Sequence, residues 1–264
     1  MPVRRLNTKG LYNARDLGGF PTADGRVTRF GVFVRSEAPV GLSPEDIAYL
    51  RAYGIAASVD LRGGIETRVR PSDLADILPY YHRPLIHEAA IPKAERLREK
   101  GPGRDWGREY ITMAEGAGHW TGDVLELAAE TEGALLFHCT TGKDRTGLLT
   151  CYLLSIAGVS RADIIADYCV SQVYLQPVYK KMLSGEIQLG PPPGSDDEKK
   201  LPPMPPLNEG FFSTRPENMQ ALLDYMDETY GGVVNFLRET GVSEERMQKL
   251  RQKLTEEETG RTTH

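Results

Sequence analysis

The residues best suited to chemistry form one short stretch, HCTTGKDRTG, at positions 138–147. In it, Cys139 is followed by Arg145 after five intervening residues. A cysteine and an arginine at that distance occur together by chance in many chains. Their surroundings make this pair specific, because the apolar run 134–137 precedes the stretch and an apolar helix pattern over 148–157 follows it. Strand, glycine-containing turn and helix are the arrangement that presents a loop above the carboxyl edge of a parallel sheet.

These residue types fit the binding and cleavage of a phosphate monoester. If the stretch curls at the start of a helix, its backbone N–H groups converge on one point and bind an anion, with help from the helix dipole. The same positive field favours the thiolate form of Cys139, which is the nucleophilic form of cysteine. Arg145 adds a planar fork that matches two phosphoryl oxygens. We therefore expect Cys139 to attack phosphorus and water to hydrolyse the phosphocysteine, a scheme that needs neither a metal ion nor another cofactor.

The elements expected around this loop are short buried strands that alternate with helices. Apolar and β-branched runs predict strands at 31–34, 55–61, 80–86 and 134–137. Ser43 followed by Pro44 predicts the start of a helix that Gly54 ends. Further helices are expected over 121–133 and 148–157. This alternation predicts an α/β fold with a central, mainly parallel sheet flanked by helices.

The rest of the chain divides by composition. Residues 88–118 are charged and contain several glycines, so helix pieces are expected there without readable boundaries. The chain is expected to stay helical to about Leu183, and the helical C-terminal part, 215–254, predicts three helices separated by glycines. Between them, the proline-rich segment 184–214 is predicted to form a surface loop or a lid. We treat 1–264 as a single domain.

The composition argues against several other classes of protein. The net charge is −5, whereas proteins that bind nucleic acid through its phosphates normally carry a basic excess. Three cysteines without a C-x-x-C pair argue against a disulfide framework and a structural zinc site. No window reaches the roughly 18 uncharged apolar residues of a membrane span, and the start lacks the apolar core of a signal peptide. These features predict a cytoplasmic protein, leave export without a signal peptide open, and indicate no oligomeric state.

The stretch 138–147 resembles the signature of the protein tyrosine phosphatase superfamily, which is His-Cys, five residues, Arg, then Ser or Thr. The whole chain is similar to the bacterial and fungal tyrosine-protein phosphatases from about Leu6 to Leu254. Besides the loop, the similarity rests on Asn13–Gly19, Arg35-Ser36, Val59–Arg62 and the tail from Arg215–Met219 through Tyr230–Gly232 to Leu250-Arg251. It is looser over 88–120 and 184–214. The resemblance implies a protein-tyrosine-phosphatase-like fold and phosphotyrosine proteins as substrates.

The resemblance also implies roles for single residues. It makes Cys139 the nucleophile, Arg145 the phosphate binder, and Thr146 the hydroxyl that stabilises the departing thiolate. For the general acid it favours the aspartate inside the loop, Asp144, and Asp105 beside a tryptophan is the second candidate. Lys143 adds a second positive charge, and similar Gly-Lys-x-Arg loops accept phosphoinositide head groups as well as phosphoprotein; a purely structural role is its alternative. We therefore expect a tyrosine phosphatase with phosphoserine, phosphothreonine and phosphoinositide as further substrate candidates.

Other residues are candidates for phosphate or substrate binding. Three of them line the loop itself: Thr140, Thr141 and Gly142. Asp60 ends a predicted strand, where α/β proteins place ligand groups, and holding a loop is its alternative role. Arg15 is a candidate for substrate contact, with an ion pair to Asp16 in a turn as the alternative.

Two other functions share parts of the pattern. A rhodanese-like sulfurtransferase also has a cysteine at the head of an anion-binding loop, but it lacks the Gly-Lys-Asp-Arg-Thr string found here at 142–146. A catalytically silent phosphate-binding module usually loses the cysteine or the arginine, and this chain retains both Cys139 and Arg145. The sequence therefore favours a catalytic protein.

Overall fold

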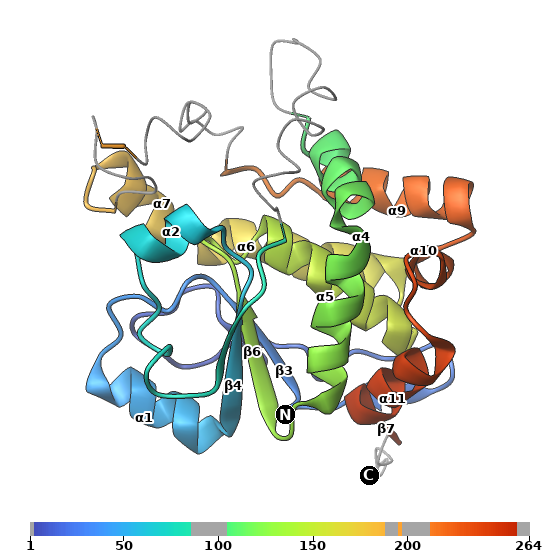
Figure 1. Ribbon diagram of the computed structural model, residues 1–264, viewed down its shortest axis with the longest axis horizontal. Helices are drawn as coiled ribbons and strands as arrows, with labels where there is room; N and C mark the ends of the chain where they lie inside the picture. Colours follow the sequence, from blue (N-terminus) through green and yellow to red (C-terminus); the bar gives the residue numbers. More distant parts are fainter. Residues whose placement is uncertain (1–2, 86–104, 188–194, 197–211, 258–264) are drawn as a thin grey trace, which may run out of the picture.

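A computed structural model describes residues 3–85, 105–187, 195–196 and 212–257. Its centre is a five-stranded sheet with the strand order β1-β3-β6-β4-β5 (Figure 1). These strands are β1 (Arg15–Asp16), β3 (Phe33–Ser36), β6 (Ala134–His138), β4 (Ile55–Asp60) and β5 (Tyr80–His82). Only β1 runs antiparallel to its neighbour, so the sheet is mainly parallel, as the sequence predicts.

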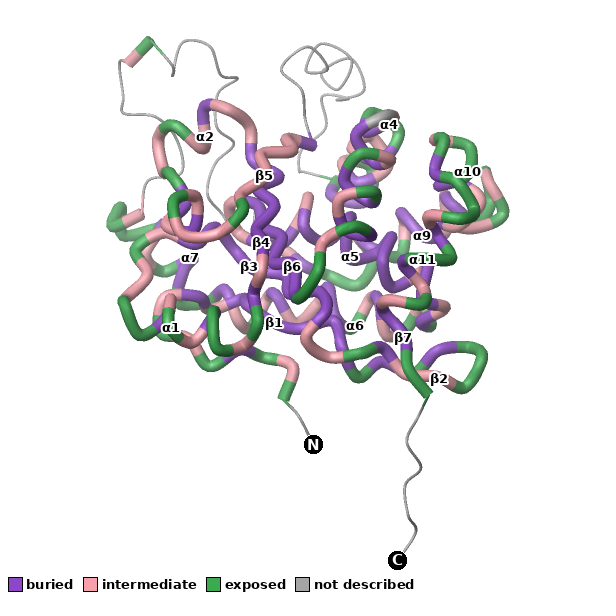
Figure 2. Tube along the Cα trace, turned by 60° about the horizontal axis from the view of Figure 1, so that its bottom comes forward, coloured by how far each residue is buried: buried purple, intermediate pink, exposed green. Residues whose placement is uncertain are grey.

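Helices cover both faces of this sheet, with α1 on one side and α4, α5 and α11 on the other (Figure 1). They are α1 (Pro44–Tyr53), α4 (Trp106–Glu130), α5 (Asp144–Ala157) and α11 (Glu244–Leu254). Successive side chains of a strand point to opposite faces. Accordingly, Leu135 and Phe137 pack into the larger core under α5, and Leu136 packs into the smaller core on the α1 side. Figure 2 shows the central strands β3, β6 and β4 largely buried between these layers. The mixed α/β fold class is confirmed.

The first helix is specified by local capping. The side chain of Ser43 accepts a hydrogen bond from the Asp46 amide, and the Asp46 carboxylate in return accepts from the Ser43 amide. Gly54 ends the helix with φ at 96°, a conformation that favours glycine. The predicted start and end of this helix are therefore confirmed.

The helix expected over 121–133 begins much earlier, at Trp106, and is α4. The glycines that obscure its start in the sequence have structural reasons. A side chain at Gly107 would place its Cβ 2.6 Å from Cβ of Ala221, so glycine allows the close approach of α9 (Pro216–Tyr230). Gly118 has φ 31° and ψ −117° and kinks the helix. Packing against a distant helix outweighs the low helix propensity that the sequence shows locally.

Other boundaries shift by a few residues. The strand expected at 31–34 is Phe33–Ser36, the strand expected at 80–86 ends at His82, and the helix expected from 148 begins at Asp144. The sequence did not predict α2 (Gly64–Val69) or the antiparallel pair β2 (Arg26–Thr28) and β7 (Thr255–Glu257). None of the helices in the described ranges is both long and apolar enough to cross a bilayer.

The predicted helices of the second half are confirmed. They are α6 (Arg161–Tyr174), α7 (Gln176–Leu183), α9, α10 (Val233–Glu239) and α11. Most of the proline-rich segment 184–214 lies outside the described residues, as do residues 86–104. The surface loop or lid expected over 184–214 and the single domain 1–264 stay predictions.

Candidate active site

The stretch 138–147 runs from the last residue of β6 into the first turn of α5, at the carboxyl end of the parallel strands. Cys139 directly follows β6 and is 1% exposed. Gly142 has φ 68°, and a Cβ there would lie 2.3 Å from the carbonyl oxygen of Ser36. Only glycine lets the chain turn this close to β3, so the residue type at 142 fixes the shape of the loop.

The loop carbonyls are held from outside the loop. The Asn13 side chain donates to the carbonyl oxygens of Thr141 and Gly142 at 3.1 and 3.2 Å, and Arg35 donates to that of Gly142 at 2.8 Å. The Thr140 carbonyl accepts from the Ala38 amide at 3.2 Å. In a trans peptide the N–H group points away from the carbonyl of the same unit, so the amides of Thr141 and Gly142, which follow the Thr140 and Thr141 carbonyls, point away from these donors. Among the described residues, no acceptor contacts the amides of Thr141 and Gly142. The loop therefore offers unpaired N–H groups next to the start of α5, the arrangement of an anion-binding nest.

The guanidinium of Arg145 is bound by a carboxylate from another element. Glu66 of α2 accepts from its two terminal nitrogens at 2.5 and 2.8 Å and also accepts from the Thr140 hydroxyl. Burial by itself raises the pKa of Glu66, but Arg145 outweighs it and lowers that pKa to about 2. Burial likewise lowers the pKa of Arg145, and Glu66 raises it above its usual value. This charged pair fixes the arginine beside the loop.

Sequence reasoning missed Glu66, although a signal for it exists. The Gly63 amide donates to the Glu66 side chain at 2.8 Å. An acidic residue at the third helical position commonly accepts such a bond from the backbone amide of the N-cap residue. A glycine pair followed by glutamate after a buried strand could have predicted the short helix. It could not have predicted that the same carboxylate reaches an arginine 79 residues away.

Asp144 lies at the start of α5 and is held by a tyrosine from α4. The Tyr110 hydroxyl donates to Asp144 Oδ1 at 2.6 Å and lies 2.7 Å from the hydroxyl of Tyr168. Burial raises the pKa of Tyr110 well above its usual value, and Asp144 adds to this, so the phenol stays protonated. Asp105, the other acid candidate, caps α4 by accepting from the Arg108 amide at 3.1 Å. Asp144 therefore lies in the loop and contacts Tyr110 of α4. For the Asp105 carboxylate, the structure describes a contact with the start of α4 and none with the loop.

Lys143 is buried beside the same helix. It is 2% exposed, and its Nζ lies 3.8 Å from the ring centroid of Trp106. The ammonium group also lies 3.5 Å from Asp144 and donates to the Ser213 carbonyl at 3.3 Å. A second positive charge is thus held within the loop, as expected.

Thr146 lies in the first turn of α5 and is fully buried. Its hydroxyl has no hydrogen-bond partner in the described part of the chain. A buried hydroxyl without a partner costs free energy, so such groups commonly serve a bound ligand or a reaction. This hydroxyl is therefore free to donate to a group that enters or forms beside it.

Asp60 and Arg15 lie in buried networks of protein groups. Asp60 accepts from Arg62 at 2.7 Å and from Tyr80 at 2.6 Å, and it is fully buried. Arg15 does not pair with Asp16, which instead accepts from the Tyr53 hydroxyl and two backbone amides. The ion pair considered between residues 15 and 16 is therefore wrong. In both cases the described partners are other protein groups, which favours a positioning role over direct contact with substrate.

The true partner of Arg15 is Asp167 of α6, a residue that the sequence did not single out. Asp167 is fully buried and accepts from Arg15 Nε at 2.8 Å and from Arg35 Nη1 at 2.6 Å. Burial alone raises its pKa, but Arg15 and Arg35 outweigh it and lower the pKa to about 2. Because Arg35 also holds the Gly142 carbonyl, this buried cluster of charges supports the loop.

Replacing Asp167 by Ala is expected to destabilise the fold strongly. Two buried guanidinium groups would lose their carboxylate, and breaking a buried ion pair on one side typically costs about 3–5 kcal/mol. The free energy of unfolding measured in urea checks this. Asp224→Ala is the control, because Asp224 pairs with Arg161 at a half-exposed site, where a loss below about 1 kcal/mol is expected. Equal losses in the two variants would contradict a special role for the buried cluster.

A second buried acid supports Asn13, which holds the loop. Glu37 follows β3 and accepts from the Tyr12 and Asn13 amides at 2.5 and 2.9 Å. Burial raises the pKa of Glu37 from 4.5 to about 7. The folded state therefore binds a proton that the unfolded state releases between these two pH values.

Because the folded pKa is raised, the stability that Glu37 contributes is present below about pH 4.5 and is lost as the pH rises through 7. The shift corresponds to about 3 kcal/mol. We expect Glu37→Gln to remove this dependence. The free energy of unfolding of the wild type minus that of the variant should therefore fall by up to that amount between pH 4.5 and 8. Urea unfolding at several pH values measures it, and the subtraction cancels other groups such as His138, whose pKa is lowered to about 4 by burial. Parallel pH profiles would disprove the assignment.

Metal ligands are a further question for the site. Within the described part of the chain, His, Cys, Asp and Glu side chains form no group of three or more that could hold a metal ion. Arg35 and Arg145 interact electrostatically with Cys139, and Lys143 belongs to the same loop.

Comparisons with known proteins agree with this geometry. The family model described as the tyrosine phosphatase family matches residues 6–256. A tyrosine-protein phosphatase of Nostoc commune is 30% identical over 84% of this chain and 74% of the relative. A putative tyrosine-protein phosphatase of Cupriavidus necator is 30% identical over 87% of this chain and 81% of the relative. A triple specificity protein phosphatase of Mycobacterium tuberculosis is 28% identical over 95% of this chain and 98% of the relative.

Proposed function

Because this chain belongs to the tyrosine phosphatase family, we propose that it is a cysteine-dependent phosphatase that hydrolyses phosphotyrosine through a phosphocysteine intermediate. The observation that carries the proposal is the loop after β6. There Cys139 is buried in a loop whose Thr140, Thr141 and Gly142 carbonyls are bound from outside the loop, and Glu66 holds Arg145. This combination supplies a nucleophile and positive charge around one phosphoryl group.

The proposed reaction has two displacements at phosphorus. The Cys139 thiolate attacks, an S–P bond forms, and the P–O ester bond breaks as Asp144 gives its proton to the leaving oxygen. Asp144 then takes a proton from water, the water oxygen attacks phosphorus, and the S–P bond breaks to return the thiolate and release phosphate. The unpartnered hydroxyl of Thr146 supports its proposed role as a donor to that thiolate.

The loop amides and Arg145 carry the negative charge that spreads over the phosphoryl oxygens, so the proposal requires no metal ion. Thr140, Thr141 and Gly142 take part through their backbone amides. Asp60 and Arg15 act as positioning residues, given their buried partners Arg62 and Asp167.

The burial of the nucleophile supports phosphotyrosine as the substrate. Cys139 is only 1% exposed, which suits a phosphoryl group carried at the end of a long side chain. The phenol ring of tyrosine extends farther than the side chain of serine or threonine. The buried charge of Lys143 supports phosphoinositides, and the name of the triple specificity relative supports phosphoserine and phosphothreonine, as secondary substrates.

The experiment that tests the proposal is hydrolysis by the wild-type protein in chelator and reductant. Its substrates are a phosphotyrosine peptide, a phosphoserine peptide and a panel of phosphoinositides. We expect turnover without added metal, fastest on phosphotyrosine, and a phosphoenzyme after rapid acid quench that maps to the peptide containing Cys139. Phosphate binding without turnover would instead indicate a silent module, and a persulfide on Cys139 would indicate a sulfurtransferase.

A further inference from the structure

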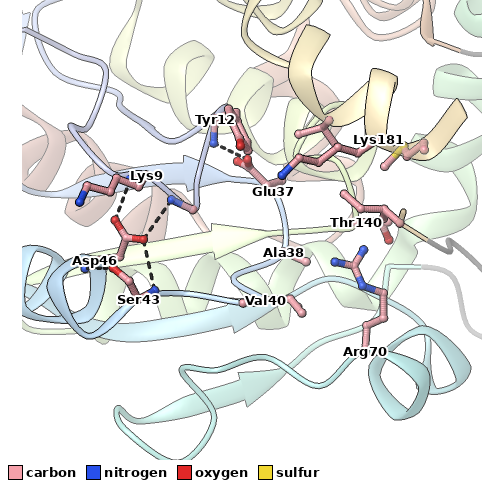
Figure 3. A pocket seen from close by; sticks show the side chains of 15 residues that line it. Lys9, Tyr12, Glu37, Ala38, Val40, Ser43, Asp46, Arg70, Thr140 and Lys181 are labelled. Atoms are coloured by element: carbon pink, nitrogen blue, oxygen red, sulfur yellow. Dashed lines mark hydrogen bonds between the residues drawn. The ribbon is translucent and has the colours of Figure 1, made fainter. Parts of the chain in front are cut away.

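A cavity adjoins the proposed active site. It lies between α1, the end of α2 and α7, and it has a volume of about 270 Å³ (Figure 3). Thr140, the residue after Cys139, lines it, so the cavity borders the loop beside the nucleophile. Drug-sized ligands occupy pockets of roughly 300–1,000 Å³. A cavity of this size suits a single side chain of a larger substrate.

Two cations face this cavity without an anionic partner. The guanidinium of Arg70 and the ammonium of Lys181 both point into it (Figure 3). Neither has a hydrogen bond or an ion pair from its side chain to any described residue, and the nearest recorded contact of Lys181 is the Tyr12 ring, 5.7 Å away. Arg70 caps α2, the helix whose Glu66 holds Arg145, and Lys181 belongs to α7. The two charges are therefore attached to elements beside the catalytic loop.

The carboxylates that line the cavity are already occupied. Asp46 accepts from the amides of Lys9 and Gly10 at 2.7 and 3.0 Å, and Glu37 accepts from two amides of the neighbouring turn. Neither carboxylate forms an ion pair with the two cations facing the cavity. The positive charge of the cavity is therefore available to a ligand.

Part of the wall is apolar. Val178 and Met182, one turn apart on α7, are buried and line the cavity together with Val40. An apolar wall beside two cations suits an aliphatic stem that ends in a carboxylate, because the stem packs and the charged end pairs. The polyhydroxyl ring of an inositol head group would leave its hydroxyls against this wall unpaired.

From this arrangement we infer that the cavity is a subsite for an acidic side chain next to the phosphotyrosine of a peptide substrate. The inference rests on the proposed function, because the phosphotyrosine is assigned to the Cys139 loop. With that phosphoryl group on the loop, the chain of the peptide passes Thr140, and a neighbouring glutamate reaches Arg70 and Lys181. The subsite selects among phosphotyrosine peptides by the charge of their flanking residues.

The test uses a set of alanine-based phosphotyrosine peptides that carry one glutamate, moved one position at a time along either side. At one or two positions we expect glutamate to raise kcat/KM about tenfold over the alanine peptide. A tenfold change is what the free energy of one charge-assisted hydrogen bond corresponds to. The Arg70→Gln and Lys181→Gln variants should each bring that ratio towards one. Lys180→Gln, at the exposed neighbouring position on α7, should keep the wild-type ratio. Raising the salt concentration should lower the ratio in the wild type and in Lys180→Gln, but not in Arg70→Gln or Lys181→Gln.

The outcomes separate this inference from the proposed function. If p-nitrophenyl phosphate and all peptides resist hydrolysis, the proposed function fails. If the alanine peptide is hydrolysed but glutamate gives no gain at any position, the subsite is wrong while the phosphatase stands. A gain that survives in both Arg70→Gln and Lys181→Gln also overturns it. The inference is also overturned if a second phosphate on a soluble inositol head group raises kcat/KM more than a glutamate at any position of the peptide does.

Discussion

Replacing Cys139 by Ser is expected to abolish turnover of a phosphotyrosine peptide, with a loss of kcat on the order of 10⁴- to 10⁶-fold, as found when a covalent nucleophile is removed. A serine hydroxyl at this position is a much weaker nucleophile than the thiolate of the proposed mechanism. Binding should survive, because the amides and Arg145 do not depend on the sulfur. Steady-state kinetics and equilibrium binding of the same peptide measure the two effects.

The control for this variant is Cys169→Ser. Cys169 is a free cysteine of intermediate burial on α6, and it belongs to no contact with the loop that the structure describes. We expect it to keep wild-type turnover. If the Cys139→Ser protein keeps turnover comparable to Cys169→Ser, the phosphocysteine mechanism is wrong. If Cys139→Ser fails to bind the peptide as well, the loop itself has changed shape, which circular dichroism and thermal unfolding would show.

The second large effect is expected for Asp144→Asn, and it should depend on the leaving group. A general acid contributes roughly 10²- to 10⁴-fold when the leaving oxygen needs a proton. An alkyl phosphate or a phosphotyrosine peptide should therefore lose far more activity than p-nitrophenyl phosphate, whose leaving group departs as an anion. Asparagine matches aspartate in size and can still accept the hydrogen bond from Tyr110. Rates on both substrates measure the contrast.

Asp105→Asn is the matched control, because asparagine is as good an N-cap as aspartate and should leave α4 intact. It should change neither rate. Equal losses on both substrates in Asp144→Asn would mean that the carboxylate acts through structure. A loss that depends on the leaving group in Asp105→Asn instead would transfer the role of general acid to that residue.

Local signals in the sequence were sufficient for much of the fold. Ser43 and Gly54 bound α1 through contacts within a few residues, and the apolar run before Cys139 places it at the end of a buried strand. Such features depend on capping and periodicity, which a sequence displays directly. The α/β class and the position of the loop were therefore predictable.

The groups that hold the loop in shape were not predictable in the same way. Glu66 lies 79 residues from Arg145, Asp167 lies 152 residues from Arg15, and Tyr110 lies 34 residues from Asp144. Nothing local distinguishes these residues from solvated ones. Their roles arise only when packing removes them from water, where an unpaired charge or hydroxyl is costly. α4 shows the same limit, because its glycines hide a helix that α9 stabilises.

The pairing of β2 with β7 has a consequence for synthesis of the chain. Arg26 to Thr28 pair with Thr255 to Glu257, and Arg29 donates to the Thr255 carbonyl across 226 residues. At the usual rates of translation, the ribosome needs about 10 to 45 s to add that many residues. During this interval β2 is an unpaired edge that can bind other nascent strands. Its closure is a late folding event that marks passage of the ribosome beyond β7.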